Sequence, residues 1–164
     1  MSSPAACAIT ALRSCGHRVA TAESLTGGLL CATLVDVAGA SDVVVGGVVA
    51  YTPEAKVELL GVDAVVVDER GTVDPETARQ MARGALACVP GATLAVATTG
   101  VAGPDPSEGH PVGTVFVAVA DARDVRVERL VLAGGRAQVR EGTVAAALSM
   151  LIDRVGEETP VNGR

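Results

Sequence analysis

Aromatic residues are nearly absent from this sequence, which has no tryptophan, one tyrosine and one phenylalanine among its 164 residues. Apolar residues still make up 49% of the chain, and most of them are alanine, valine and leucine. The core must therefore be built from small and β-branched side chains, which favours buried strands and close packing of helices on a sheet. The length is about that of one domain.

Basic runs and long apolar runs are also missing. The net charge is −6, and no cluster of basic residues is interleaved with aromatic ones, so we do not expect nucleic acid as a partner. The longest apolar runs, such as residues 43–51, are too short to span a bilayer, and no basic segment precedes the modest apolar stretch near the N-terminus. We therefore expect a protein that is neither secreted nor bound to a membrane.

The sequence lacks the cysteine spacings of metal sites and disulfide frameworks. None of its cysteines belongs to a CxxC pair or to a Cys/His cluster. Three of the four occupy apolar positions of predicted helices, which is typical of reduced core cysteines. We therefore predict a cytoplasmic protein without a metal site. The four are Cys7, Cys15, Cys31 and Cys88.

Hydrophobic periodicity and turn residues predict an alternation of helices and strands. The predicted helices cover residues 4–15, 26–37 and 53–60, a stretch that begins at 74–76, and a stretch that begins at 134–135. The predicted strands cover 17–22, 41–51, 93–99, 113–121 and 125–132. The apolar run at 41–51 predicts a buried strand, and the tight turn at Ala122 and Arg123 requires the last two strands to be antiparallel.

This order of elements predicts the fold class. Helices that alternate with strands favour a three-layer α/β/α sandwich on a mixed, mostly parallel sheet of about five strands. We expect one domain over residues 1–155, because no linker or repeat divides the chain. The polar residues 156–164 are predicted to form a disordered tail.

The first candidate site is the junction at residues 23–28, where a predicted strand leads into a helix. Glu23 is a candidate substrate-binding acid, and Ser24 is a candidate nucleophile. Thr26, Gly27 and Gly28 could supply hydroxyl and backbone donors to an oxyanion or a phosphate. The same residues also fit a plain helix cap in which the glycines only permit the turn.

The second candidate site holds Lys56, the only lysine in a chain with twelve arginines, and Tyr51, the only tyrosine. Thr52 and Pro53 are typical of a helix start, so Lys56 falls in a first turn, where the helix dipole disfavours a cation. A buried amine there has a lowered pKa and suits a general base, a role that arginine cannot fill. The alternative is a solvated surface lysine.

The third candidate site follows the predicted strand at 93–99. Thr99 and Gly100 could form the floor of a ligand site, although the stretch matches neither a Walker A loop nor a dinucleotide fingerprint. The long loop that follows carries Asp105 and Glu108, and it could be a lid or only a connection.

Arg136 and Arg140 lie four residues apart at the start of the last predicted helix, where cations are disfavoured unless an anion binds. A phosphate is one candidate partner, because guanidinium groups hold phosphate oxygens in bidentate fashion. An ion pair, with Glu141 or with an acid across an interface, is the alternative.

Five stretches, in order, resemble the CinA C-terminal family. They are residues 22–28 (AESLTGG), 46–51 (GGVVAY) with 54–56 (EAK), 99–104 (TGVAGP), 111–115 (PVGTV), and 135–136 (GR) with Arg140. The resemblance covers about residues 5–155. The chain differs from the usual family pattern at Leu25, at Thr52 with Pro53, and in the turn at 105–107. Many relatives carry a larger N-terminal domain. The resemblance of this chain is to the C-terminal domain alone, so we expect it to be the stand-alone form.

The resemblance implies a nicotinamide-nucleotide amidohydrolase that needs no metal or other cofactor and acts on a small nucleotide as a homodimer. It implies Ser24 as nucleophile, Lys56 as its base and Tyr51 as an orienting neighbour. It also implies that residues 26–28 and 99–100 surround the substrate, with Arg136 and Arg140 near a 5′-phosphate. Two alternatives stay open: an amidase for another small amide, and a non-catalytic nucleotide-binding or competence-associated accessory protein.

Overall fold

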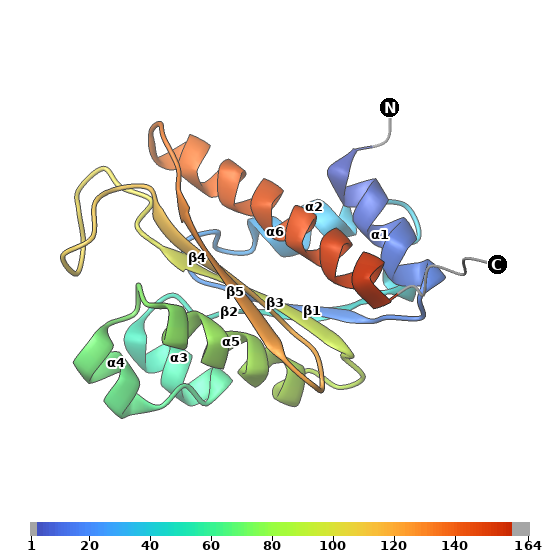
Figure 1. Ribbon diagram of the computed structural model, residues 1–164, viewed down its shortest axis with the longest axis horizontal. Helices are drawn as coiled ribbons and strands as arrows, with labels where there is room; N and C mark the ends of the chain where they lie inside the picture. The colour runs from blue at the N-terminus through green and yellow to red at the C-terminus, as the bar shows by residue number, and fades with distance from the viewer. Residues whose placement is uncertain (1–2, 159–164) are drawn as a thin grey trace.

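The computed structural model describes residues 3–158, which form a five-stranded sheet between two layers of helices (Figure 1). The strand order is β2-β1-β3-β4-β5. β1 is parallel to β2 and β3, whereas β4 is antiparallel to both β3 and β5. The strands are β1 (Val19–Glu23), β2 (Val44–Val49), β3 (Leu94–Gly100), β4 (Thr114–Ala120) and β5 (Val125–Val131).

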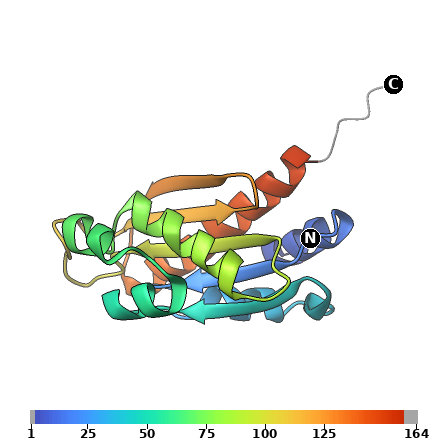
Figure 2. The same cartoon turned by 90° about the horizontal axis from the view of Figure 1, so that it is seen from below.

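Helices cover both faces of the sheet, which confirms the predicted three-layer α/β/α sandwich (Figures 1 and 2). One face carries α1 (Pro4–Ser14), α2 (Leu29–Val35) and α6 (Arg136–Glu158), and a short 3-10 turn at Ala40–Asp42 precedes β2. The other face carries α3 (Pro53–Leu60), α4 (Ala64–Arg70) and α5 (Pro75–Cys88). Asp74 caps α5 as predicted, because its carboxylate accepts a hydrogen bond from the backbone N–H of Glu76 at 2.8 Å.

The two halves of the core differ in side-chain size, and this difference explains how the chain folds almost without aromatic residues. Toward α5, the sheet presents mainly alanines from β1, β3 and β4, so the helix packs close to the strands. Gly84 of α5 even lies against the backbone of α3, since an added Cβ would fall 1.9 Å from the carbonyl oxygen of Leu60. The opposite half is filled by larger leucine and valine side chains.

Two predictions of local structure were wrong, and one helix was missed. The stretch at 41–51 does not form a buried strand, because β2 lies at the edge of the sheet and its residues are partly or largely exposed. Helix α4 was not predicted, since its run of three valines favours strand over helix, although Asp63 caps it and Gly71 ends it. The predicted tail begins too early, because α6 continues to Glu158; residues 159–164 lie outside the described residues.

The cysteines are not core residues. None of the four forms a disulfide within the described residues; Cys7, Cys15 and Cys88 are exposed and Cys31 is half-buried. Three of the four were predicted at apolar helical positions, but Cys7 of α1 and Cys88 of α5 are not among the residues that these helices bury. Within residues 3–158 no helix is both long and apolar enough to cross a membrane. In the same residues, no group of His, Cys, Asp and Glu side chains is arranged to hold a metal ion.

Candidate active site

The candidate site lies at the end of the sheet where the parallel strands β1, β2 and β3 finish. Glu23, the last residue of β1, pairs with Val49 of β2 on one side and with Thr98 of β3 on the other. The residues that follow these strands therefore meet in one place, which is where open α/β sheets bind ligands. Ser24, Tyr51 and Gly100 meet at this end of the sheet, although they are far apart in the sequence.

Ser24 and Lys56 form a direct pair at this end of the sheet. The ammonium Nζ of Lys56 donates a hydrogen bond to Ser24 Oγ at 2.9 Å, and further ones to the carbonyl oxygens of Ala50 at 3.0 Å and Tyr51 at 3.4 Å. Lys56 is 1% exposed and Ser24 is 8% exposed. Burial among neutral groups lowers the pKa of Lys56 from 10.5 to about 8, although the negative charge of Glu108 acts in the opposite direction.

Helix α3 holds Lys56 in this position through its capped first turn. The hydroxyl of Thr52 accepts a hydrogen bond from the backbone N–H of Ala55 at 3.2 Å, and Pro53 fills the first helical position. Lys56 is the fourth residue of α3, and its amine reaches Ser24, which directly follows β1. The predicted helix start is therefore confirmed, and the lysine is buried rather than solvated.

Glu23 is buried, and its carboxylate stabilises the start of α2. Its oxygens accept hydrogen bonds from the backbone N–H groups of Gly28 and Leu30 at 3.0 Å and of Cys31 at 2.8 Å. The hydroxyl of Thr21 donates a further one at 3.2 Å. A carboxylate at a helix N-terminus is favoured by the dipole, so Glu23 fixes the geometry of the turn that carries Ser24. It is not among the residues that line the cavity beside Ser24.

The turn after Ser24 contains two backbone donors without an acceptor. Gly27 N–H donates to the Ser24 carbonyl oxygen at 3.0 Å, and Gly28 N–H donates to Glu23. Both glycine amides are therefore engaged within the protein, contrary to the prediction that they would donate to a ligand. The amides of Leu25 and Thr26 have no hydrogen-bond acceptor among residues 3–158. These amides immediately follow the candidate nucleophile, which is a typical position for oxyanion donors.

The two threonine hydroxyls expected near the substrate connect segments of the fold instead. The hydroxyls of Thr26 and Thr98 lie 2.7 Å apart in the interior. The hydroxyl of Thr99 donates to the carbonyl oxygen of Thr72 at 2.6 Å and so holds the α4–α5 connection against β3. Gly100 lies where a side chain would not fit, because an added Cβ would be 2.6 Å from the Thr114 carbonyl oxygen.

The two arginines of α6 have different roles. Arg140 lies behind the nucleophile turn, where its Nε donates to the carbonyl oxygen of Leu25 at 3.0 Å and its Nη2 to that of Thr26 at 2.8 Å. Arg136 is exposed, and it donates to the carbonyl oxygen of Gly103 at 2.7 Å and to the hydroxyl of Tyr51 at 2.9 Å. Arg140 therefore supports the turn, and Arg136 lies at the rim of the site.

A cavity of about 250 Å³ opens beside Ser24, a size that suits a small ligand. Its lining residues are Ser24, Leu25, Tyr51, Thr72, Val73, Gly100, Val101, Ala102, Gly103, Asp105, Ser107 and Arg136. Sequence reasoning missed Thr72 and Val73, which come from the connection between α4 and α5 and carry no motif. A larger, mainly apolar groove of about 430 Å³ between α1, α2 and α6 lacks such a pair of reactive side chains.

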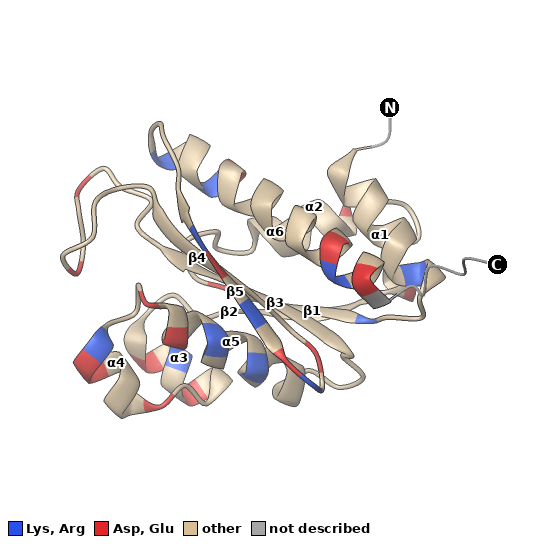
Figure 3. Ribbon diagram, in the orientation of Figure 1, with Lys and Arg blue, Asp and Glu red and all other residues tan. Residues whose placement is uncertain are grey.

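Charge is distributed unevenly around the site. The basic segments at the start of α6 and the acidic ones of the loop between β3 and β4 lie at the same end of the molecule (Figure 3). The interior strands of the sheet carry almost no charge in the same view. The lining of the cavity contains one residue of each sign, Asp105 and Arg136, among otherwise uncharged residues.

Comparisons with known proteins agree with this architecture. A family model described as the CinA C-terminal domain matches residues 2–155. A CinA-like protein of Mycobacterium marinum is 49% identical over 138 residues, which are 82% of this chain and 32% of the relative. A CinA-like protein of Geobacter sulfurreducens is 45% identical over 144 residues, which are 87% of this chain and 35% of the relative. The chain thus spans about a third of the length of these curated relatives.

Solved structures match over almost the full length of both chains. The crystal structure of the competence/damage inducible protein CihA from Agrobacterium tumefaciens has a TM-score of 0.86 and 40% identity, and the match covers 93% of this chain and 98% of that one. The competence damage-inducible protein A (ComA) from Klebsiella pneumoniae has a TM-score of 0.92 and 34% identity, with coverage of 95% and 97%.

Proposed function

The chain belongs to the CinA C-terminal domain family, and from this premise we propose that it hydrolyses the carboxamide of nicotinamide mononucleotide to nicotinate mononucleotide and ammonia. One observation carries the reaction class: the buried amine of Lys56 lies 2.9 Å from the hydroxyl of Ser24. The substrate follows from the family resemblance, and the cavity is of a size to hold its reacting part. The chemistry is that of a Ser–Lys amidohydrolase.

Lys56 acts as the general base in this proposal. A pKa of about 8 leaves about a tenth of the enzyme with a neutral amine at pH 7, against about one part in three thousand for a lysine at 10.5. The neutral amine accepts the proton of Ser24 Oγ as that oxygen attacks the carboxamide carbon. The π electrons of the carbonyl move to oxygen, and in this proposal the N–H groups of Leu25 and Thr26, for which the described residues supply no acceptor, stabilise the resulting oxyanion.

The tetrahedral intermediate then collapses. The carbonyl re-forms, the C–N bond breaks, and the protonated Lys56 gives its proton to the departing nitrogen, which leaves as ammonia. Water attacks the acyl-Ser24 ester in the second half of the reaction, with Lys56 again accepting a proton and returning it to Ser24 Oγ. The products are the carboxylate and the free enzyme, so the same two side chains serve both steps.

Arg136 is the proposed contact for the 5′-phosphate. It is the arginine that lines the cavity, and its two bonded partners are the exposed hydroxyl of Tyr51 and a loop carbonyl, both of which a phosphate could replace. Arg140 is not proposed for this contact, because its donors are engaged by the carbonyls of the nucleophile turn. Tyr51 then has the role of orienting Arg136 at the rim.

A second candidate function, an amidase for a small amide without a phosphate, is favoured by a specific observation. Arg136 and Arg140 each donate two hydrogen bonds to neutral oxygen atoms of the protein, so a phosphate would have to compete with these bonds. In this alternative the Ser24–Lys56 chemistry is unchanged and Arg136 is only a structural residue.

Ammonia release by the purified protein separates these possibilities. We expect turnover of nicotinamide mononucleotide by the wild type and none by Ser24→Ala. Replacement of Arg136 by methionine should raise KM for the nucleotide roughly tenfold or more and leave that for nicotinamide riboside unchanged. Arg129→Met, an exposed arginine of β5, is the matched control. Equal turnover of both substrates, unaffected by Arg136→Met, favours the second candidate, and a wild type that releases ammonia from neither substrate contradicts the first.

A further inference from the structure

The loop over residues 101–112 connects β3 to β4 and ends in a tight hairpin at the site end of the molecule (Figure 1). Ser107 and His110 exchange backbone hydrogen bonds of 3.1 and 2.8 Å across this hairpin. Glu108, at its tip, has a φ of 50° and is the one non-glycine residue with a positive φ in the described part of the chain. Such a conformation is unfavourable for a side chain other than glycine unless its surroundings hold it in place.

The surroundings that hold Glu108 are the amides of the α4–α5 connection. Its carboxylate accepts hydrogen bonds from the backbone N–H of Thr72 at 2.7 Å, from the hydroxyl of Thr72 at 2.6 Å and from the backbone N–H of Val73 at 2.9 Å. Gly71 makes room for this contact, because a Cβ there would lie 2.4 Å from Glu108 Oε2. These bonds join two segments that are more than 30 residues apart in the sequence.

The same two segments form walls of the cavity beside Ser24. Thr72 and Val73 line one part of it, and Asp105 and Ser107 line another. The hydroxyl of Thr99 fixes Thr72 to β3, and Arg136 fixes Gly103 at the base of the loop. The bonds of Glu108 are therefore the contacts that hold the far part of the loop in the cavity wall.

Glu108 also acts on the amine of Lys56 through its charge. The groups that touch the amine are neutral: the hydroxyl of Ser24 and the carbonyls of Ala50 and Tyr51. Among the described residues, Glu108 is the charged group that shifts the pKa of Lys56, and it raises it. Burial works to raise the pKa of Glu108 itself, but hydrogen bonds from Thr72 and Val73 outweigh it and keep the carboxylate ionised.

We propose that Glu108 is a positioning residue that fastens the loop over residues 101–112 to the α4–α5 connection and so completes the substrate cavity. The proposal rests on the proposed function for its kinetic consequences, whereas its structural consequence is independent of any substrate. Both backbone N–H groups donate to one oxygen of the carboxylate and the Thr72 hydroxyl to the other, so a glutamine could keep all three contacts without the charge, whereas an alanine removes them.

Hydrogen exchange tests the structural part without a substrate. In Glu108→Ala we expect amide exchange in segments 101–112 and 71–74 to rise by about tenfold or more, because bonds to a charged group are lost. Glu69→Ala, at an exposed residue of α4, is the matched control and should leave exchange unchanged. Thr72→Val removes one of the three donors and should give a smaller rise. Unchanged exchange in Glu108→Ala overturns the proposal.

Kinetics of the same variants test the role in the site. Loss of the fastening should raise KM several-fold more than it lowers kcat, since the cavity wall contacts substrate and Glu108 does not. Loss of its charge should also lower the pKa of Lys56 and move the acidic limb of kcat/KM to lower pH. A uniform fall in kcat without either change contradicts a positioning role. A silent wild type defeats the proposed function alone, and the exchange experiment still decides the role of Glu108.

Discussion

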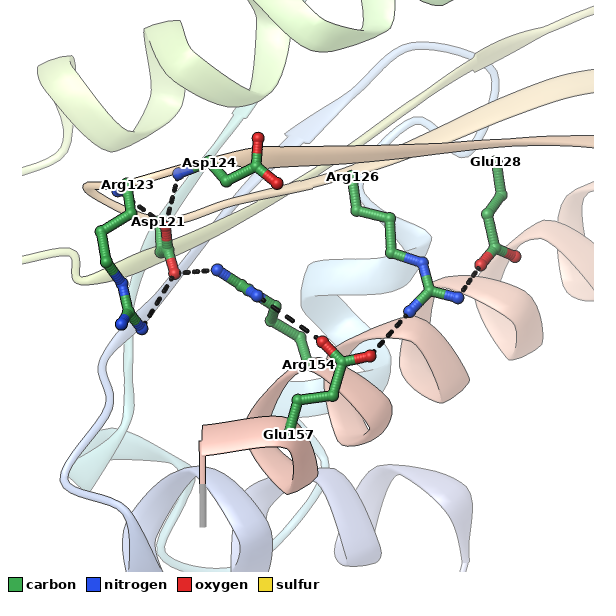
Figure 4. Close-up of polar contacts among 7 residues, drawn as sticks. All are labelled: Asp121, Arg123, Asp124, Arg126, Glu128, Arg154 and Glu157. Carbon is green, nitrogen blue, oxygen red and sulfur yellow. Dashed lines mark hydrogen bonds and ion pairs between the residues drawn. The ribbon is translucent and has the colours of Figure 1, made fainter. Parts of the chain in front are cut away.

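The two ends of the sheet handle buried charge in opposite ways. At the end where β1 and β3 finish, the amine of Lys56 is buried among neutral oxygens, and none of the residues 3–158 brings a carboxylate into contact with it. At the end where β4 finishes, the side chain of Asp121 is 6% exposed and is held by the guanidinium of Arg154 and by the backbone N–H groups of Arg123 and Asp124 (Figure 4). The first arrangement favours the neutral form of its group, and the second favours the charged form.

The pKa values express this difference. Burial lowers the pKa of Lys56 to about 8, which weakens folding at neutral pH and prepares a base. Burial would raise the pKa of Asp121, but the hydrogen bonds from Asp124, Arg123 and Arg154 outweigh it and lower the pKa to about 2. That carboxylate therefore adds stability at neutral pH. One end of the fold thus holds a buried amine that suits the proposed proton transfer, whereas the other holds a carboxylate that stabilises the fold.

The largest expected effect is that the two ends respond differently when lysine and arginine replace each other. Lys56→Arg should lower kcat/KM for ammonia release at least about a thousandfold, because arginine cannot become neutral. Arg154→Lys at the other end should keep wild-type turnover and lose only about 1 kcal/mol of stability. Steady-state kinetics of both variants measures the change in activity, and denaturant unfolding measures the change in stability. A Lys56→Arg enzyme with wild-type activity would contradict the difference between the two ends.

Asp121→Asn should destabilise the fold by roughly 2 kcal/mol at pH 7. The folded pKa lies below the unfolded value of 3.8, so this stabilisation is fully present above about pH 4 and is lost as the pH falls to about 2. Urea unfolding at several pH values measures it. The wild type should lose its advantage over the variant within that acidic window, and a constant difference down to pH 2 would contradict the assignment.

Lys56→Met should have the opposite sign and stabilise the fold by about 1–3 kcal/mol at pH 7 while abolishing turnover. The unfolded chain keeps the lysine proton up to a pKa of 10.5 and the folded one only to about 8, so wild-type stability rises across this range. The gain in the variant should therefore shrink between pH 8 and 10.5. Thermal unfolding of both proteins over this range is the measurement. A variant less stable than the wild type would contradict the view that burial of the protonated amine destabilises the fold.

The smallest effect is expected at the periphery of the Asp121 end. Arg126 pairs with Glu128 at 2.8 Å and with Glu157 at 3.1 Å, and all three side chains are more than a third exposed (Figure 4). Exposed pairs contribute little because water and salt screen them. Arg126→Ala should therefore change the free energy of unfolding by less than about 1 kcal/mol, and less still in high salt. A larger loss would show that Arg126 contributes to stability as Asp121 and Arg154 do.

The comparison also shows which parts of the molecule could be predicted from the sequence. Lys56 stood out because it is the only lysine and lies in a first helical turn, and both features are local. The helices and strands that carry the site also followed from periodicity and caps. Glu23, in contrast, was predicted to meet substrate, and its bonds to the start of α2 depend on a turn whose path cannot be derived from residue types.

Residues that depend on tertiary packing were not predictable. Thr72 and Val73 reach the cavity only because α4 and α5 place their connection opposite the end of β3. The run at 41–51 was assigned to the interior because apolar content does not tell a central strand from an edge strand. The exposure of Cys7 and Cys88 follows from which side of α1 and α5 faces the sheet, a choice between two partly apolar faces.

The most direct test of the account is the pH dependence of Ser24 acylation by an activated acyl reagent, followed by intact-protein mass between pH 6 and pH 10. No natural substrate is needed, and comparison with Ser24→Ala separates acylation of Ser24 from that of the exposed cysteines. We predict that the rate of Ser24 acylation rises with pH, is half-maximal near pH 8 and then levels off, with no such inflection in Lys56→Arg. A serine that does not react, or one that reacts equally in Lys56→Arg, would contradict the central claim.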